Sequence, residues 1–195
     1  MKTTSESAST PETLVPFPPE VIRRYRAAGM WSDRTLAQEF RAIADYHPGH
    51  LAVITPDARL TYAELDRRTD RLALGLRDLG LRPGERVLLQ VTNGVWAVLA
   101  WYGLLKAGLV PIATLALHRR HEILEIARQA EPVAHLIEPG FRGHDLVALA
   151  AEVTKAQPTL RRLLTIGTAT PPAAAITLES LESADRPAAP RTRPS

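Results

Sequence analysis

Residues 86–137 read RVLLQVTNGVWAVLAWYGLLKAGLVPIATLALHRRHEILEIARQAEPVAHLI, and this stretch decides the fold. Short apolar runs at 86–91, 109–113 and 133–137 alternate with two longer stretches of helical periodicity. Short apolar strands that alternate with helices are typical of parallel sheets, in which each strand is followed by a right-handed crossover. We therefore predict an α/β fold with a doubly wound, mainly parallel sheet and helices on both faces.

The first helix of this stretch is expected over residues 94–107. Its apolar side chains occur nearly all round, which predicts a helix buried between two layers. Asn93 is expected to cap its start, and Gly108 is expected to end it. A membrane span over 94–117 is the alternative, but Lys106 near its middle and the glycine and proline that follow argue against it.

Further elements are expected on both sides of this stretch. Thr61 and Glu64 have the spacing of a helix capping box, and Ser32 is a second candidate cap. The expected elements are a helix at 33–46, strands at 51–55 and 59–61, helices at 62–79, 119–130 and 145–156, and a strand at 160–166.

The two ends of the chain have a different composition from its middle. Residues 1–14 are rich in Ser and Thr, and residues 168–195 are rich in Ala, Pro and Thr. Such segments bury little apolar surface, so we expect a disordered leader and a disordered tail, in which residues 178–181 are a candidate for one helical turn. The folded domain is expected to cover residues 15–167.

Composition limits the classes of function. The chain has 195 residues, of which 45% are hydrophobic and 23% charged, and a net charge of +3. These values are typical of one globular domain and do not call for a nucleic-acid or membrane partner. The absence of cysteine excludes a disulfide scaffold, a thiolate metal site and a cysteine nucleophile. No apolar signal segment begins the sequence, and we expect a cytoplasmic protein.

Parallel α/β sheets bind ligands at the carboxyl ends of their strands. No phosphate-binding glycine motif follows any expected strand. The densest polar cluster, His118-Arg119-Arg120-His121, has three interpretations: a solvated helix cap, a contact to a ligand or partner, or a metal site, the last being weak without carboxylates. The candidate substrate or partner contacts are His118, Arg119, Arg120 and Asn93. No catalytic residue and no metal ligand is predicted.

Two motifs resemble the adenylate-forming enzymes, the superfamily of acyl- and aryl-CoA ligases, luciferases and peptide-synthetase adenylation domains. Residues 60–65 (LTYAEL) match its first core motif, L-[TS]-Y-x-E-L, and residues 105–111 (LKAGLVP) match its second, L-K-A-G-x-x-x-P. The residues that carry the match are Leu60, Thr61, Tyr62, Glu64, Leu65, Leu105, Lys106, Ala107, Gly108 and Pro111. Both motifs also have an interpretation that involves no catalysis. The first motif predicts a helix cap, and the second predicts the end of a helix that is followed by a buried strand.

A narrower resemblance is to the aryl-acid ligases that load 2,3-dihydroxybenzoate or salicylate in siderophore pathways. Residues 17–20 (FPPE), 24–26 (RYR) and 29–31 (GMW) resemble the opening of that subfamily. Residues 115–122 resemble its A-L-P-S-H-R-x-x-E stretch, with Ala116 and Leu117 in place of the proline and serine. The likeness covers residues 15–167.

The resemblance implies a parent reaction in which a carboxylate and ATP give an acyl-adenylate and pyrophosphate, with ATP and Mg²⁺ as cofactors. The family's phosphate-binding loop and catalytic lysine have no counterpart in residues 1–195. The resemblance therefore implies a truncated amino-terminal subdomain that binds no cofactor alone, which leaves its standing as an enzyme open. Two alternatives are a scaffold half completed by the missing carboxy-terminal part, and a non-catalytic module that binds a pathway carrier protein.

Overall fold

The computed structural model describes residues 15–167 and 174–183, and the chain divides into two compact units between Thr35 and Leu36. The expected leader at 1–14 and most of the expected tail, 168–173 and 184–195, lie outside the described residues. In chain order the elements are α1 (Pro19–Ala27), α2 (Leu36–Tyr46), β1 (Leu51–Ile54), β2 (Arg59–Thr61), α3 (Tyr62–Asp78), β3 (Arg86–Gln90), α4 (Val95–Ala107), β4 (Val110–Ala113), α5 (Arg120–Ala130), β5 (Ala134–Ile137), the 3₁₀ helix η1 (Phe141–Gly143), α6 (Leu146–Ala156), β6 (Arg162–Thr165), β7 (Ala175–Thr177) and α7 (Leu178–Ser183).

The first unit contains α1 and a small aromatic cluster. Pro19 stands at the start of α1, where its missing N–H costs no helical hydrogen bond. The ring of Trp31 stacks on Tyr25 with 5.2 Å between centroids and meets Phe17 edge-on at 5.1 Å. Stacked and edge-to-face aromatic pairs contribute about 0.5–1.5 kcal/mol each beyond the area that they bury.

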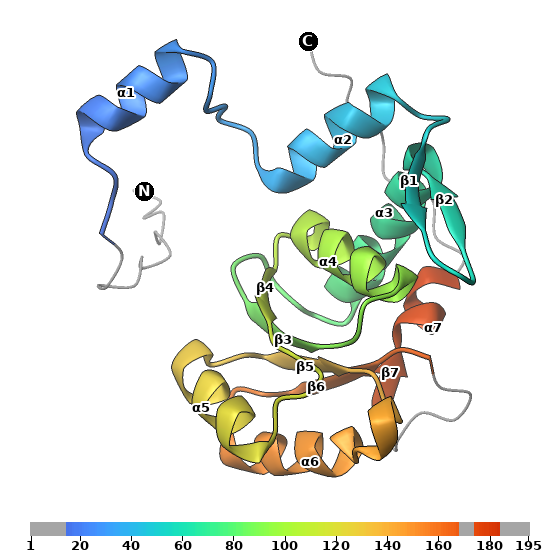
Figure 1. The fold of residues 1–195 in the computed structure, drawn as a ribbon. Helices are drawn as coiled ribbons and strands as arrows, with labels where there is room; N and C mark the ends of the chain where they lie inside the picture. The colour runs from blue at the N-terminus through green and yellow to red at the C-terminus, as the bar shows by residue number, and fades with distance from the viewer. Residues whose placement is uncertain (1–14, 168–173, 184–195) are drawn as a thin grey trace, which may run out of the picture. The chain divides into compact units, whose positions relative to one another are not determined.

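In the second unit, five strands form one parallel sheet in the order β4-β3-β5-β6-β7 (Figure 1). Leu88 of β3 lies opposite Ile112 of β4 and His135 of β5. The strand β5 lies at the centre and is buried along its whole length. The predicted α/β fold with a parallel sheet is confirmed. A separate antiparallel pair, β1 and β2, precedes α3.

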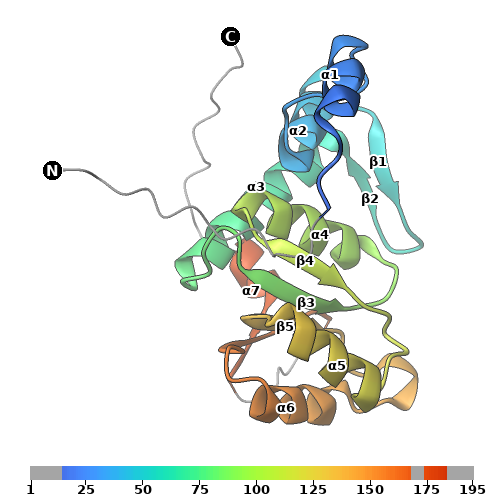
Figure 2. The same cartoon turned by 90° about the vertical axis from the view of Figure 1, so that its left-hand side faces the viewer.

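Helices cover both faces of the sheet (Figures 1 and 2). One apolar core joins α3, α4 and α7 to the sheet and includes Leu72, Leu99 and Leu104. The other joins α5 and α6 to the opposite face and includes Ile123 and Val153. None of the helices in the described part of the chain combines the length and the hydropathy that a membrane span requires.

The α3 and α4 helices pack closely because small residues lie between them. A Cβ atom on Gly103 would come within 3.0 Å of the Cβ atom of Leu72. The helix α4 ends at Gly108, which has the left-handed conformation (φ 81°) that favours glycine. The expected end of this helix is therefore observed, but its expected start is wrong. Gly94, in extended conformation, occupies the N-cap position in place of Asn93 and makes no side-chain capping bond.

The start of α3 is the capping box expected from the sequence. The Thr61 hydroxyl accepts a hydrogen bond from the Glu64 backbone N–H at 3.3 Å, and the Glu64 carboxylate accepts one from the Thr61 N–H at 2.8 Å. The hydrogen bonds from the backbone and hydroxyl of Thr61 hold the pKa of Glu64 below its usual value. The two residues thereby satisfy donors that the first turn of a helix leaves free.

We expect Thr61→Ala to lower the free energy of unfolding by about 1 kcal/mol, because the substitution removes the acceptor for the Glu64 N–H. Urea unfolding followed by circular dichroism measures this change. Thr61→Ser keeps the hydroxyl and serves as the matched control, with a smaller loss. Equal losses for the two variants would show that the methyl group, and not the cap, carries the effect.

Two other elements differ from the expectation. The helix α2 begins at Leu36 and not at residue 33, because the Ser32 hydroxyl accepts from the Arg34 N–H in a turn that ends before the helix. The strand β4 was expected to be buried but lies at an edge of the sheet, with Val110 43% exposed. Pro111 suits an edge strand because it has no N–H to donate to a neighbour.

The expected tail also requires a correction, because residues 175–183 are structured. The strand β7 pairs with β6, with Ile176 opposite Leu164. The helix α7 buries Leu178 and Leu181 in the core shared with α3 and α4. The carboxylate of Glu182 accepts hydrogen bonds from Arg68 at 2.6 and 2.7 Å. These contacts extend the folded domain beyond residue 167.

Candidate functional site

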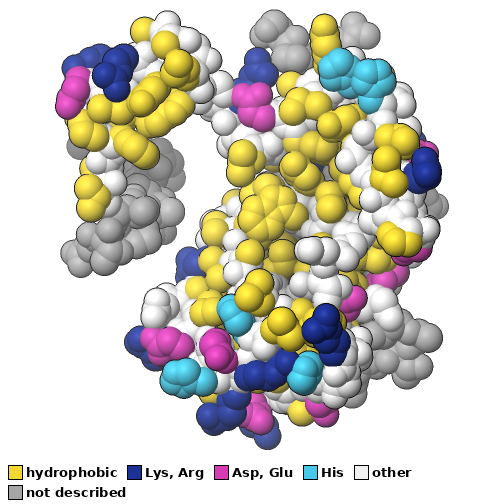
Figure 3. Space-filling view, in the orientation of Figure 1, with side chains coloured by type: hydrophobic (Ala, Val, Ile, Leu, Met, Phe, Trp, Pro, Cys, Tyr) yellow, Lys and Arg dark blue, Asp and Glu magenta, His cyan; other side chains and the backbone are white. Residues whose placement is uncertain are grey.

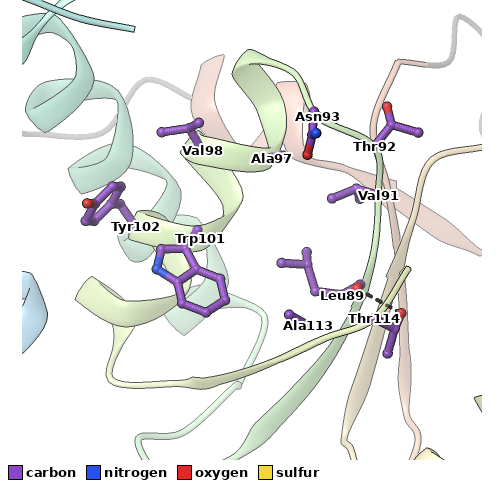
Figure 4. A pocket seen from close by; sticks show the side chains of 10 residues that line it. All are labelled: Leu89, Val91, Thr92, Asn93, Ala97, Val98, Trp101, Tyr102, Ala113 and Thr114. Atoms are coloured by element: carbon purple, nitrogen blue, oxygen red, sulfur yellow. Dashed lines mark hydrogen bonds between the residues drawn. The ribbon is translucent and has the colours of Figure 1, made fainter. Parts of the chain in front are cut away.

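The carboxyl ends of β3, β4 and β5 meet at one edge of the sheet, where parallel α/β proteins bind their ligands. The segments that follow these strands are 91–94, 114–119 and 138–145. Beside this edge lies an open hollow of about 330 Å³ between α4 and the ends of β3 and β4 (Figure 4). It is the candidate site, and its lining residues are Leu89, Val91, Thr92, Asn93, Ala97, Val98, Trp101, Tyr102, Ala113 and Thr114.

The lining of this hollow is mostly apolar. Trp101 and Tyr102 of α4 line it, and in Figure 4 the Trp101 ring lies near Ala113, whereas the Tyr102 ring lies on the side of α4 away from β3. The polar lining groups are the side chains of Thr92, Asn93 and Thr114 and the edges of the two aromatic rings, and no lining side chain is charged. Figure 3 shows hydrophobic side chains gathered over the region of α4. Such a surface suits an apolar or aromatic group.

Hydrogen bonds fix the rim of the hollow. The Thr114 hydroxyl donates to the Leu89 carbonyl at 3.0 Å (Figure 4). The Glu138 carboxylate accepts from both the N–H and the hydroxyl of Thr92, at 2.7 and 2.6 Å. The Thr92–Glu138 pair ties the end of β3 to the end of β5. This pair was not predicted from the sequence, although both residues directly follow expected strands.

Gln90 fixes the segment that carries the basic cluster. Its side-chain amide donates to the His118 carbonyl at 3.0 Å and lies 3.5 Å from the Leu115 carbonyl. The His118 ring in turn accepts from the Leu115 N–H at 3.4 Å through Nδ1. In the sequence, the only indication of this contact is that Gln90, a polar residue, ends an apolar run that forms a buried strand.

The structure does not bring the four candidate residues together. Asn93 lines the hollow, whereas Arg119 and Arg120 line a separate cleft of about 250 Å³ between the starts of α5 and α6. His118 lines neither the hollow nor this cleft. Arg119 donates to the carbonyls of Ala116 and His118 within its own turn.

Arg120 of the basic cluster and the two glutamates of α5 that follow it have local partners. Arg120 pairs with Glu152 of α6 at 2.7 Å, and both side chains are exposed. Hydrogen bonds from the N–H groups of Glu122 and Arg119 lower the pKa of Glu122. Hydrogen bonds from Arg128 and then Gln129 lower the pKa of Glu125 to about 2. These carboxylates are ionised helix-surface groups and do not form an acid–base pair.

The described residues do not fit a Mg·ATP complex. Triphosphate binding needs a cradle of backbone N–H groups and a cation, and Mg²⁺ prefers several carboxylate or carbonyl oxygens. No group of three His, Asp or Glu residues in the described ranges could hold a metal ion. The apolar lining of the hollow offers no set of donors for phosphate oxygens.

The two sequence motifs form parts of the scaffold that supports this edge. The first supplies the buried residues Leu60 and Leu65 and the cap of α3. The second ends α4, and its lysine side chain is only 4% exposed. Lys106 donates to the Asp66 carbonyl and carboxylate at 2.8 and 2.5 Å and to Asp70 at 2.8 Å. The motif lysine therefore joins α4 to α3.

Comparison with known proteins gives consistent results. The family model described as AMP-binding enzyme matches residues 40–194. Salicyl-AMP ligase / salicyl-S-ArCP synthetase of Mycobacterium tuberculosis is 39% identical over 79% of this chain and 28% of its own length. The 2,3-dihydroxybenzoate-AMP ligase of Bacillus subtilis is 32% identical over 80% of the chain and 29% of its own length.

The solved structures agree with the sequence relatives. The apo structure of Mycobacterium smegmatis MbtA superposes with a TM-score of 0.80 at 39% identity, over 92% of this chain and 33% of that one. The chain thus spans about 28% of the length of the curated relatives that it matches. The match over residues 40–194 includes both motifs and the whole five-stranded sheet. The chain belongs to the family of AMP-binding enzymes.

Proposed function

We propose that this chain forms the amino-terminal sheet subdomain of an aryl-acid adenylating ligase. The observation that carries the proposal is the 39% identity to a salicyl-AMP ligase together with a TM-score of 0.80 to a solved relative over 92% of the chain. In the whole enzyme an oxygen of the aryl carboxylate attacks the α-phosphorus of ATP, and the bond to pyrophosphate breaks. The products are an aryl-adenylate and pyrophosphate.

We infer that residues 1–195 do not carry out this reaction alone. Mg²⁺ would neutralise the charge that develops on the phosphates, and preorganised donors would hold them. The described residues provide neither set, because the hollow is apolar and the nearby carboxylate Glu138 accepts from Thr92. The contribution proposed for this chain is the rigid edge at the ends of β3, β4 and β5, against which the remainder of the ligase completes the site.

The proposed partners follow from the same likeness. The Mycobacterium tuberculosis relative is a salicyl-S-ArCP synthetase as well as a salicyl-AMP ligase. We propose that an aryl carrier protein of the same pathway accepts the aryl group, and that the reaction takes place in the cytoplasm. The segment that holds His118, Arg119 and Arg120 is the proposed contact region, because Arg120 and the half-buried His118 and Arg119 lie at this edge of the sheet.

A pyrophosphate-exchange assay tests the proposed function. With the purified chain and either salicylate or 2,3-dihydroxybenzoate, we expect no exchange above a protein-free blank. A chimera in which residues 36–183 replace the matching segment of the Mycobacterium tuberculosis relative is expected to show salicylate-dependent exchange. The same relative without that segment is the negative control. Exchange by the chain alone, or a folded chimera without exchange, contradicts the proposal.

A further inference from the structure

One face of the central strands carries polar side chains inside an otherwise apolar layer. Because Leu88 pairs with His135 and Gln90 pairs with Ile137, alternation places Gln90 and His135 on the same face of the sheet. The pairing of Ile137 with Thr165 adds Thr165 to that face. Leu88 and Ile137, which share this face, pack against α5 and α6. The three polar side chains therefore lie in the layer between the sheet and these helices.

His135 is fully buried in this layer, with 0% exposure. Neither of its ring nitrogens has a hydrogen-bond partner among the described residues, and the same holds for the Thr165 hydroxyl and for Oε1 of Gln90. Burial alone lowers the pKa of His135 to about 3. The ring is thus neutral, and a charge on it would have no counter-ion or acceptor.

The elements around His135 provide no charge that faces it. The buried side chains of α5 are Ile123 and Ala127, and those of α6 are Leu146, Leu149, Ala150 and Val153. The charged or titratable residues on β3, β6, α5 and α6 are all half-buried or exposed: Arg86, Arg120, His121, Glu122, Glu125, Arg128, Glu152, Lys155 and Arg162. Burial lowers the pKa of His135, and charged neighbours do not contribute to this change. This agrees with the half-buried or exposed positions of the charged residues.

We propose that His135 makes the packing of α5 and α6 on the sheet sensitive to acid, because the buried ring can take up a proton only when this layer opens. Opening exposes the imidazole to water, where the charged form is solvated. The layer is expected to open as a unit, because Leu88 and Ile137 on both sides of His135 share one apolar cluster with the two helices. The proposed effect of acid on this layer thus originates at the centre of the sheet.

The direction of the effect follows from linkage. The pKa of His135 is about 3 in the closed layer and near its ordinary value of 6.5 in the open one, so the open state binds more protons between these values. The free energy that keeps the layer closed has its full value above pH 6.5 and decreases as the pH drops below 6.5. For one site with these two values, the opening equilibrium rises about 25-fold between pH 7 and pH 5.

Amide hydrogen exchange at pH 7 and pH 5, corrected for intrinsic rates, tests the proposal on the full chain. We expect the opening equilibria of amides in β5, α5 and α6 to rise about 25-fold on acidification in the wild type. His135→Phe keeps a buried ring without a titratable group and is expected to remove most of this rise. His121→Gln, which removes an exposed histidine on α5, is the matched control and should behave as the wild type. An equal rise in the wild type and in His135→Phe overturns the proposal.

A measurement on the wild type alone covers the case in which His135→Phe does not fold. NMR of the chain with isotope-labelled histidine reports the protonation of each ring. We expect the His135 ring to remain neutral in the folded chain at pH 5. A folded-state titration of His135 near pH 6.5 overturns the proposal, because the proton would then enter without opening the layer.

Discussion

A chain that stops after Gly167 is expected to lose its cooperative fold, because the truncation removes both β7 and α7. Leu178 is 2% exposed and packs with Leu72, Leu76, Leu136 and Leu164 in an enclosed apolar cluster. Without β7, the neighbouring strand β6 becomes an edge of the sheet. The truncation therefore uncovers the centre of the core that lies between the sheet and α3.

The size of this loss can be estimated from the apolar residues alone. Full burial of a leucine side chain contributes about 1.5–3 kcal/mol, so Leu178 and Leu181 together contribute about 3–6 kcal/mol. A domain of this size has a total free energy of unfolding of about 5–15 kcal/mol. Loss of the two leucines and of the β6–β7 pairing thus removes a large share of the stability.

An ion pair adds to the attachment of α7. Glu182 accepts from Arg68 and also from Arg71 at 3.1 Å. The guanidinium of Arg68 lies 5.3 Å from the centre of the Trp96 ring. Burial raises the pKa of Glu182, but the hydrogen bonds and charges of the two arginines outweigh it, and the net pKa is lowered. The contribution of this pair is therefore lost as Glu182 is protonated in acid.

Urea unfolding and binding of a hydrophobic dye measure the effect of the truncation. We expect the chain that stops after Gly167 to bind the dye and to show no cooperative transition. A chain that stops after Ser183 keeps every contact described above and is the matched control, with a transition close to that of the full chain. Equal transition midpoints for the two truncated chains would show that β7 and α7 are dispensable.

The parallel sheet could be predicted because its central strands are local apolar runs. Residues 86–90 and 134–137 are apolar enough to mark buried strands without any long-range information. The strand β7 has only three residues in an Ala- and Pro-rich context, and α7 is six residues long. Their stability comes from partners such as Arg68, which is 114 residues away from Glu182. Local patterns contain no signal for such a contact.

The sequence could predict where the candidate site lies, at the carboxyl ends of the strands, but not which side chains form it. The sequence places polar groups after each strand, and the structure shows that these groups form the rim of a hollow beside α4. Which of them meet depends on the conformation of the loops. Gly94 occupies the capping position in place of Asn93, and the Arg119 side chain donates to the carbonyls of Ala116 and His118. The spacing of residues along the chain predicts neither the capping by Gly94 nor the contacts of Arg119.

The second large effect is expected for Lys106→Met, which removes the charge of the motif lysine and retains most of its volume. The ammonium group lies between Asp66 and Asp70 on α3, and the Asp66 side chain is 3% exposed. It also lies 5.3 Å from the centre of the Phe40 ring of α2. Arg41 of α2 contacts both carboxylates, at 3.8 Å from Asp66 and more closely at Asp70. The cluster joins three helices through two cations and two carboxylates.

Removal of one partner of a buried ion pair leaves an uncompensated charge in the interior, which costs about 3–5 kcal/mol. After Lys106→Met, Arg41 alone remains for the carboxylates of Asp66 and Asp70. We therefore expect a loss of about 3–5 kcal/mol in the free energy of unfolding, measured by urea unfolding at pH 7. Lys155→Met, on the exposed side of α6, is the matched control and should change stability by less than about 0.5 kcal/mol.

A double variant separates the charge from the packing. Asp66→Asn together with Lys106→Met removes one charge of each sign from the buried cluster, so it is expected to recover part of the stability that Lys106→Met loses. If the loss came instead from the shape of the lysine stem against the Phe40 ring, the second substitution would recover nothing. If Lys106→Met unfolded at the same urea concentration as the wild type, the motif lysine would have no part in joining α3 to α4. Its presence in the motif would then need an explanation in the chemistry of the whole ligase.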